Sequence, residues 1–256
     1  LFIHFHGGAW LPEVAAERLD GTAVISIQVG SGSGTYAKSF NDSQLFSRLL
    51  AEAESKAGTK FSPITLTAWS AVVTYGHVKA GDCVLVQGCG GVALFALQFA
   101  KSLGAHVTVI SSTADRMARA RELGADAVLN YREQPEWAKA TRGFTQGRGY
   151  DLILELGGEK TLPQSLRCVR PGGTLAMIGI LSGSSVNASL GHIITRQVRL
   201  QGVTVGHRDG MEAMLRGMAQ HRIVPVVDKV FAFEELKEAM AYLKSGAQFG
   251  KVCIQH

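Results

Sequence analysis

Short runs of apolar and β-branched residues alternate with longer segments of helical period from Asp82 to His221. Such runs are typical of strands buried on both faces of a parallel sheet, and the longer segments are typical of the helices that cover it. The pattern predicts strands at residues 83–87, 106–111, 127–130, 151–155, 174–180 and 197–205. Helices are predicted between them, at residues 92–103, 115–123, 136–142, 161–169 and 209–221, with the Pro-Gly-Gly run at 171–173 stopping the fourth. We therefore expect an α/β fold with a doubly wound parallel sheet.

The chain on either side of this region has a different pattern. Before it, strands are predicted at residues 1–5 and 23–28 and a helix at 42–57, and the Gly-Ser run at 30–34 has the composition of a linker or of a strand-end loop. After it come a strand at 227–230, an amphipathic helix at 233–244 and a strand at 250–254. The prediction is an atypical α/β segment over residues 1–65, a sheet domain over 66–226, and an appended helix and strand over 227–256.

Composition and charge exclude several other classes of protein. Hydrophobic residues make up 46% of the 256 residues and charged residues 18%, which is typical of a globular core. The net charge of +5 is modest and the basic residues are scattered, so nucleic-acid binding is not expected. Neither a signal peptide nor a long apolar stretch occurs, so we expect a soluble cytoplasmic protein, and its first residue, Leu1, is typical of a fragment or a processed product.

The cysteines give no indication of a metal site or of a disulfide framework. Cys83, Cys89, Cys168 and Cys253 form no CxxC pair and have no Cys/His spacing typical of zinc ligands. We expect reduced, mostly buried thiols and no bound metal.

A glycine-rich turn carries the strongest functional signal. Gly88 and Gly90 follow a predicted strand directly, and Ala93 completes a G-x-G-x-x-G/A pattern that opens a helix with Gly91 and Val92. The first glycine permits a tight turn, the second lets the backbone approach a pyrophosphate, and the small third residue lets the helix pack on the strand. The free N–H groups of the helix N-terminus then favour phosphate. The sequence predicts a Rossmann-type dinucleotide site; an ordinary glycine turn explains fewer of these features.

The end of the next strand indicates which dinucleotide is preferred. An acidic residue there would accept hydrogen bonds from the adenosine ribose, but this strand ends in Ser111 and Ser112. Small hydroxyls leave room for a 2′-phosphate, and Arg116 in the following helix could pair with it. NADP(H) is therefore favoured over NAD(H). Two alternatives stay open: Asp115 could reach the ribose, and Arg116 could be a solvated surface cation.

Further glycines follow the fourth and fifth predicted strands. Gly157 and Gly158 follow the fourth, and Gly179 lies at the fifth, two residues before Leu181. Ligands bind at the carboxyl ends of such strands, so we expect these loops to border the nicotinamide. Plain turn chemistry is the alternative.

Several ordered motifs resemble one family. They are residues 66–71 (LTAWSA), 78–82 (VKAGD), 84–99, 123–126 (LGAD), 130–133 (NYRE) and 249–251 (FGK). Together they resemble the zinc-independent branch of the medium-chain alcohol dehydrogenase and quinone reductase superfamily over residues 66–256. The resemblance implies an NADPH-binding domain that passes hydride to or from quinones, enones, small carbonyls or alcohols, often in homodimers that pair through the strand at 197–205. It also implies an amino-terminal barrel that residues 1–65 do not resemble, and loss of this barrel would impair the activity of the chain.

The resemblance also implies roles for single residues. It assigns Gly91 and Val92 to the pyrophosphate. Ser112, Arg116 and Tyr131 fall on the side of the adenosine 2′-phosphate. Thr67, Gly179 and Leu181 fall on the nicotinamide side. Lys251, preceded by Phe249 and Gly250, would close over the cofactor from the carboxyl-terminal segment. No proton donor is implied.

The first 65 residues resemble a different family. Residues 5–10 (FHGGAW) resemble the oxyanion-hole loop of esterase-type α/β-hydrolases, and with a strand predicted at 64–66, Ser70 falls where a nucleophile elbow is expected. Ala68 and Val72 replace both glycines of G-x-S-x-G, so a helical Ser70 without a catalytic role is the better interpretation. His4 and His6 are better read as structural residues.

The two resemblances predict a junction near residues 65–71, and hence a chimeric or truncated chain. Three hypotheses follow: an NADPH-dependent oxidoreductase, a non-catalytic NADP-binding module, and an esterase.

Overall fold

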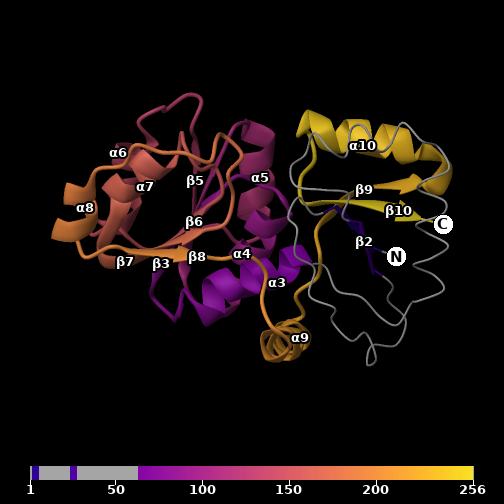
Figure 1. The fold of residues 1–256 in the computed structure, drawn as a ribbon, viewed down its shortest axis with the longest axis horizontal. Coiled ribbons are helices and arrows are strands. Elements are labelled where there is room, and N and C mark those ends of the chain that lie inside the picture. Colours follow the sequence, from indigo (N-terminus) through magenta and orange to yellow (C-terminus); the bar gives the residue numbers. More distant parts are fainter. Residues whose placement is uncertain (1, 6–23, 28–62, 256) are drawn as a thin grey trace. The chain divides into compact units, whose positions relative to one another are not determined.

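The computed structural model describes residues 2–5, 24–27 and 63–255 (Figure 1). It divides into two compact units, of which one comprises Ile64–Val226 with Phe249–Lys251 and the other the described parts of the remaining chain. The strands predicted near the amino terminus are confirmed: β1 (Phe2–Phe5) and β2 (Val24–Ile27) pair in parallel. The helix predicted at 42–57 and the glycine run at 30–34 lie outside the described residues.

The first unit is built on a six-stranded sheet with the predicted topology. Its strands are β3 (Cys83–Gln87), β4 (His106–Ser111), β5 (Ala127–Asn130), β6 (Tyr150–Glu155), β7 (Val169–Met177) and β8 (Arg199–Gly202). They lie in the order β5-β4-β3-β6-β7-β8, and every neighbouring pair is parallel. This order reverses direction beside β3, as in a classic doubly wound Rossmann sheet. The predicted fold class is therefore confirmed.

Helices cover both faces of this sheet (Figure 1). They are α3 (Pro63–Trp69) with the short η1 (Ser70–Thr74), α4 (Gly91–Ser102), α5 (Ala114–Glu122), α6 (Trp137–Arg142) with η2 (Gly143–Thr145), α7 (Leu162–Cys168), α8 (Leu190–Thr195) and α9 (Arg208–His221). Alternate residues of β3 point to opposite faces: Val84 and Val86 pack in the core with α3 and α4, and Leu85 packs in the core with α6 and α7. Burial on both faces explains the near-continuous apolar strands.

Several predicted boundaries are wrong. The segment at 64–66, predicted as a strand, is helical in α3. The Pro-Gly-Gly run does not separate helix from strand but lies inside β7, whose pairing with β6 is irregular between Tyr150 and Leu152. A Cβ at Gly173 would lie 2.8 Å from the Tyr150 carbonyl oxygen, so close backbone packing explains a glycine here. β7 ends at Met177, which places Gly179 in the following loop, and the short helix α8 was not predicted.

The second unit contains the strand, helix and strand that the carboxyl-terminal pattern predicts. They are β9 (Val227–Ala232), α10 (Leu236–Ser245) after the turn η3 (Phe233–Glu235), and β10 (Lys251–Gln255), of which only Lys251 belongs to the first unit. β9 pairs with β10. Glu235 accepts a hydrogen bond from the Ala232 N–H at 2.8 Å, and the Tyr242 hydroxyl donates to Asp228 at 2.7 Å. These contacts tie the helix to β9.

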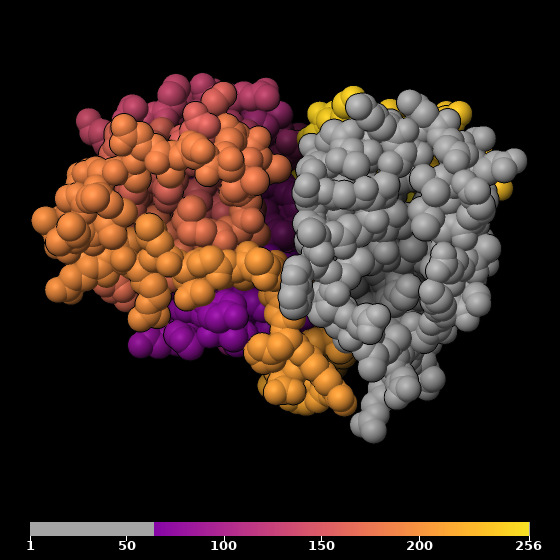
Figure 2. All heavy atoms as spheres, viewed as in Figure 1, coloured from indigo at the N-terminus to yellow at the C-terminus, as the bar shows by residue number. Residues whose placement is uncertain are grey.

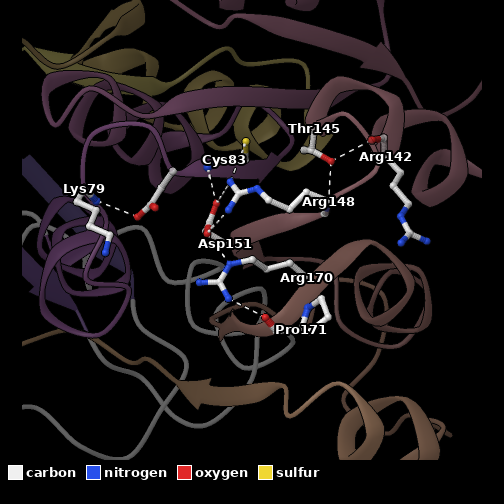
Figure 3. Close-up of polar contacts among 10 residues, drawn as sticks. Lys79, Cys83, Arg142, Thr145, Arg148, Asp151, Arg170 and Pro171 are labelled. Atoms are coloured by element: carbon white, nitrogen blue, oxygen red, sulfur yellow. Dashed lines mark hydrogen bonds and ion pairs between the residues drawn. The ribbon is translucent and has the colours of Figure 1, made fainter.

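An ion-pair cluster lies at the amino-terminal edge of the sheet (Figure 3). Asp151, near the start of β6, accepts hydrogen bonds from Arg148 at 2.6 and 3.1 Å, from Arg170 at 2.5 Å and from the Cys83 N–H at 2.7 Å. The Asp151 side chain is only 8% exposed. Burial alone would raise the pKa of Asp151, but the Cys83 N–H and the two guanidinium groups outweigh it and hold the pKa below its ordinary value. The cluster joins the starts of β3, β6 and β7.

We expect Asp151→Asn to lower the free energy of unfolding by about 2 kcal/mol at pH 7, because two guanidinium groups lose their counter-charge. A carboxylate with a lowered folded-state pKa stabilises the fold above its unfolded pKa of about 3.9, and that contribution is lost as pH falls through the folded value. The difference between wild type and variant should therefore shrink below about pH 4 in urea unfolding. Exposed Glu122→Gln is the control, and a pH-independent difference would contradict the ion-pair role.

Candidate functional site

The predicted site residues gather at the carboxyl-terminal edge of the sheet, opposite the cluster of Figure 3. Gly88 to Val92 follow β3, Ser112 follows β4 and Tyr131 follows β5. Gly157 lies in the loop after β6, and Gly179 in the loop after β7. Ser111 is itself the last residue of β4. Because the strands are parallel, these ends share one edge of the sheet.

The glycine turn between β3 and α4 has a side that no described residue contacts closely. Gly88 has φ +78°, a left-handed conformation that favours glycine, and its N–H donates to the Ile110 carbonyl at 2.7 Å. Gly90 caps α4 with extended backbone, and its carbonyl accepts from the Leu94 N–H at 3.0 Å. A Cβ built on Gly88 or Gly90 would meet no described atom within 4 Å. By contrast, Ala93 is fully buried in the core. The turn therefore packs on the core at Ala93, while no described side chain fills the positions beside Gly88 and Gly90.

The N-terminus of α4 is suited to an anion. The helix has 12 residues and no acidic side chain in its first turn, so the N–H groups and the dipole are not offset by negative charge on the helix itself. Gly91 and Val92 are its first two residues. The Lys251 Cδ and Nζ atoms lie 3.0 and 3.6 Å from the position of a Gly91 Cβ. A lysine ammonium therefore lies beside the free end of the helix.

We call the segment Phe249–Lys251 the strap, because it crosses the glycine turn. The Gly250 N–H donates to the Cys89 carbonyl at 2.9 Å, and the Lys251 N–H donates to the Val226 carbonyl at 2.9 Å. Gly250 has φ +88°, and a Cβ there would overlap the Val226 carbonyl oxygen. Only glycine fits at this point, so the strap backbone is held close to the turn.

The ends of β4 and β5 form the predicted adenosine side. Ser111 and Ser112 are buried, and the Tyr131 N–H donates to the Ser111 carbonyl at 3.0 Å. Burial raises the pKa of the Cys89 thiol, which donates to the Ser111 hydroxyl at 3.4 Å. Arg116 lies half-buried in the first turn of α5, beside the exposed Asp115. The Ser111 hydroxyl is thus engaged with Cys89 in the structure.

The loops after β6 and β7 pack tightly on each other. A Cβ at Gly179 would overlap the Leu156 carbonyl, and one at Gly158 would lie 3.1 Å from the Ile180 Cα. The Ser182 N–H donates to the Gly157 carbonyl at 2.7 Å. These glycines allow loop to meet loop, which is the turn-chemistry alternative from the sequence. Beside them, the Leu181 side chain is 89% exposed.

Comparison with known proteins identifies the family of this chain. The zinc-binding dehydrogenase family matches residues 91–220, about half of the chain. The chain belongs to this family. The zinc-type alcohol dehydrogenase-like relatives and the solved structures place it among the medium-chain dehydrogenases and reductases, the superfamily that the motifs indicated.

Relatives of this dehydrogenase-family chain differ in cofactor and substrate. A zinc-type alcohol dehydrogenase-like protein of Schizosaccharomyces pombe is 41% identical over 198 residues, covering 74% of this chain and 57% of the relative. A solved NAD-dependent alcohol dehydrogenase is 31% identical with a TM-score of 0.70, covering 77% of this chain and 57% of that one. A 2-octenoyl-CoA carboxylase reductase, solved with NADP and 2-octenoyl-CoA, is 27% identical with a TM-score of 0.71, covering 75% and 48%. The chain spans about half the length of the relatives it matches.

The family's description implies zinc, which proteins bind through His, Cys, Asp and Glu side chains. Within residues 2–5, 24–27 and 63–255 no group of three or more His, Cys, Asp and Glu side chains could hold a metal ion. The described residues therefore do not fit a zinc site. Among the same residues, no helix is long and apolar enough to cross a membrane.

The α3 region places Ser70 in a helix. Ser70 is 2% exposed and lies in helical η1, where its hydroxyl oxygen would be 2.6 Å from a Cβ on Gly206. A buried helical serine is not presented on a strand-to-helix elbow, so the sequence expectation of a helix residue is confirmed. The FHGGAW loop at 5–10 lies outside the described residues except for Phe5 in β1. Thr67, in α3, donates its hydroxyl to the Thr204 carbonyl at 2.7 Å.

The sequence analysis missed a buried polar network between the glycine turn and the β6 loop. Glu155, the last residue of β6, is fully buried and accepts from Gln87 Nε2 at 2.8 Å, the Gly157 N–H at 3.2 Å and the Gly158 N–H at 3.0 Å. It also accepts from the hydroxyls of Thr161 and Ser165. The Gln87 Oε1 accepts from the Leu156 and Gly157 N–H groups. The network links the residue before Gly88 to the loop after β6.

Proposed function

We propose that this chain forms the cofactor-binding part of an oxidoreductase that uses NADP(H) in preference to NAD(H) and needs no zinc. The observation that carries the proposal is the glycine turn, where no described atom lies within 4 Å of a Cβ on Gly88 or Gly90. The turn leads directly into α4, whose first turn has no acidic side chain. When bound, the nicotinamide supplies or accepts a hydride.

The pyrophosphate has a set of donors at the turn. The N–H groups of Gly91 and Val92 lie in the first turn of α4, where no intrahelical acceptor is available to them. Lys251 lies beside Gly91 and supplies positive charge. Gly88, Gly90 and Gly250 allow the turn and the strap to approach the ligand closely. We assign the pyrophosphate to this place.

The adenosine 2′-phosphate is assigned to the ends of β4 and β5. Ser111 and Ser112 occupy the end of β4, where an acidic residue would repel the 2′-phosphate. Tyr131 lies beside them, since its N–H donates to the Ser111 carbonyl. Arg116 supplies the charge. Asp115 lies in the first turn of α5, where an acidic side chain complements the helix dipole.

The nicotinamide is assigned to the loops after β6 and β7, with Gly157, Gly179 and Leu181, and to Thr67 of α3. The exposed Leu181 and Ile180 provide an apolar surface at this edge. The related reductase is bound to 2-octenoyl-CoA, an α,β-unsaturated thioester. We therefore propose enones, quinones and small carbonyls or alcohols as substrates. We assign no proton donor among the described residues.

Titration of the protein with NADPH and with NADH, followed by a screen of quinones and enones, tests the proposal. We expect Arg116→Ala to weaken NADPH binding by about tenfold or more, because a charge-assisted hydrogen bond is worth roughly 1.5–3 kcal/mol. NADH binding should not change. The control is Arg121→Ala, an exposed arginine of the same helix. Equal binding of both cofactors, with no effect of Arg116→Ala, would reject the assignment. Binding without turnover would favour the non-catalytic module.

We also propose that two copies of the chain associate through β8 and α8. Exposed apolar side chains gather on and around these elements, and the orange atoms of this part of the chain lie at the surface in Figure 2. They are Val186, Leu190, Ile194 and Leu200, between 38% and 71% exposed. β8 is an edge strand of the sheet, which can pair with another strand. A homodimer would cover both features.

A further inference from the structure

The strap is held by a contact that lies away from the glycine turn. The Phe249 ring is 2% exposed, and the Arg119 guanidinium carbon lies 4.0 Å from its centroid. A guanidinium over an aromatic face at this distance is a cation–π contact, which is strongest where the ring is shielded from water. Phe249 is therefore fixed between the core and helix α5.

The position of Phe249 decides the position of the two residues that follow it. Gly250 is bonded to the Cys89 carbonyl, and Lys251 extends to Gly91 at the start of α4. Both residues have little freedom, because Gly250 packs against the Val226 carbonyl. A shift of the ring would therefore move the lysine relative to the pyrophosphate position.

Two of the three arginines of helix α5, Arg116 and Arg119, have different surroundings. Arg116 and Arg119 are three residues apart, so they share one face of the helix. Arg116 is in the first turn, next to Thr113, whose hydroxyl accepts the Arg116 N–H at 3.4 Å. Arg119 is one turn further and reaches the strap. The two arginines therefore meet different parts of the site.

We propose that Arg119 is a positioning residue that holds the strap, and through it Lys251, against the pyrophosphate site. This rests on the proposed function. The pyrophosphate is common to NADPH and NADH, so a residue that acts through the strap affects both cofactors equally. A residue that meets the 2′-phosphate affects NADPH alone. The two roles are therefore separable by experiment.

The test compares Arg119→Gln, Arg119→Lys and Lys251→Ala with wild type and with the control Arg121→Gln, by titration with both cofactors. Arg119→Gln should weaken NADPH and NADH by the same factor, about tenfold. Arg119→Lys keeps a cation over the ring and should recover most of the affinity. The double variant Arg119→Gln/Lys251→Ala should bind little more weakly than Lys251→Ala, because both changes remove the same interaction.

A cofactor-free measurement accompanies the titrations. Amide hydrogen exchange at Gly250 and Lys251 should be faster in Arg119→Gln than in wild type, with unchanged exchange in the central strands β3 and β6. Unchanged exchange and affinity would overturn the inference and leave the proposed function standing. If Arg119→Gln weakened NADPH binding alone, Arg119 would be a ligand of the 2′-phosphate and the inference would be wrong. If the losses of affinity in Arg119→Gln and Lys251→Ala were additive in the double variant, Arg119 would not act through Lys251. If the wild type binds neither cofactor, the proposed function fails and this inference fails with it.

Discussion

Gly90→Val should abolish most cofactor binding and leave the fold almost unchanged. Gly90 has φ −80° and ψ −179°, which any residue adopts, and a Cβ there meets no described atom within 4 Å. The side chain would fill the space outside the turn, where we place the pyrophosphate. We expect NADPH affinity to fall by roughly a hundredfold, equivalent to about 3 kcal/mol. The free energy of unfolding should fall by less than about 1 kcal/mol, from the poorer helix cap.

A second glycine provides a matched control. Gly143, at the end of α6, has helical backbone and likewise no described atom within 4 Å of its Cβ. Gly143→Val should leave both NADPH affinity and stability near wild type. NADPH titration by protein fluorescence and urea unfolding of the same samples measure the two quantities. Full-strength NADPH binding by a folded Gly90→Val would show that the open side of the turn does not receive the cofactor.

Local chemistry made the glycine turn predictable from the sequence. The end of the strand, the tight turn and the start of the helix all lie within ten residues, from Gln87 to Ala96. The pattern of apolar residues identifies the strand and the helix on either side of the turn. Burial on both faces also made the fold class predictable, because near-continuous apolar strands are typical of a parallel sheet covered by helices on both faces. The fold class and the location of the turn therefore needed no tertiary information.

Contacts between distant segments could not be predicted in this way. Gly179 follows β7 as a cofactor loop would, but its backbone packs against Leu156 from the neighbouring loop. Likewise, α8 buries none of its six residues, so no apolar stripe marks it in the sequence. The Arg119 and Phe249 pair joins residues 130 positions apart. Each feature depends on which segments meet, and one sequence does not contain that information.

The Glu155 network left a weak signal in the sequence that pattern analysis did not use. Gln87 and Glu155 are buried polar residues at the carboxyl-terminal positions of two mainly apolar strands. A buried polar side chain requires hydrogen-bond partners, so two such residues on adjacent strands indicate that each serves the other. Strand adjacency was the missing information, since β3 and β6 are 62 residues apart. The pairing of β3 with β6 provides it.

Glu155→Gln should lower the free energy of unfolding by about 3 kcal/mol. The buried Glu155 carboxylate accepts hydrogen bonds from five donors. A glutamine side chain has one NH₂ group, which would face some of these donors. The Oε1 atom receives the Gly157 and Gly158 N–H groups, so the amide oxygen must stay there. The NH₂ group would then face the Gln87 NH₂ group. Urea unfolding at pH 7 measures the loss, with exposed Glu122→Gln as the control.

The exchanged pair Gln87→Glu/Glu155→Gln separates this network from a general effect of polarity. A glutamate at position 87 still accepts from the Leu156 and Gly157 N–H groups, and it can accept from the NH₂ of a glutamine at 155. The Ser165 hydroxyl, 3.0 Å from Gln87 Nε2, can donate to it as well. We therefore expect the double variant to recover more than half of the stability lost in Glu155→Gln, since donors and acceptors match again. A double variant less stable than either single one would show that the two side chains do not act as a pair, and the link between the glycine turn and the β6 loop would need another origin.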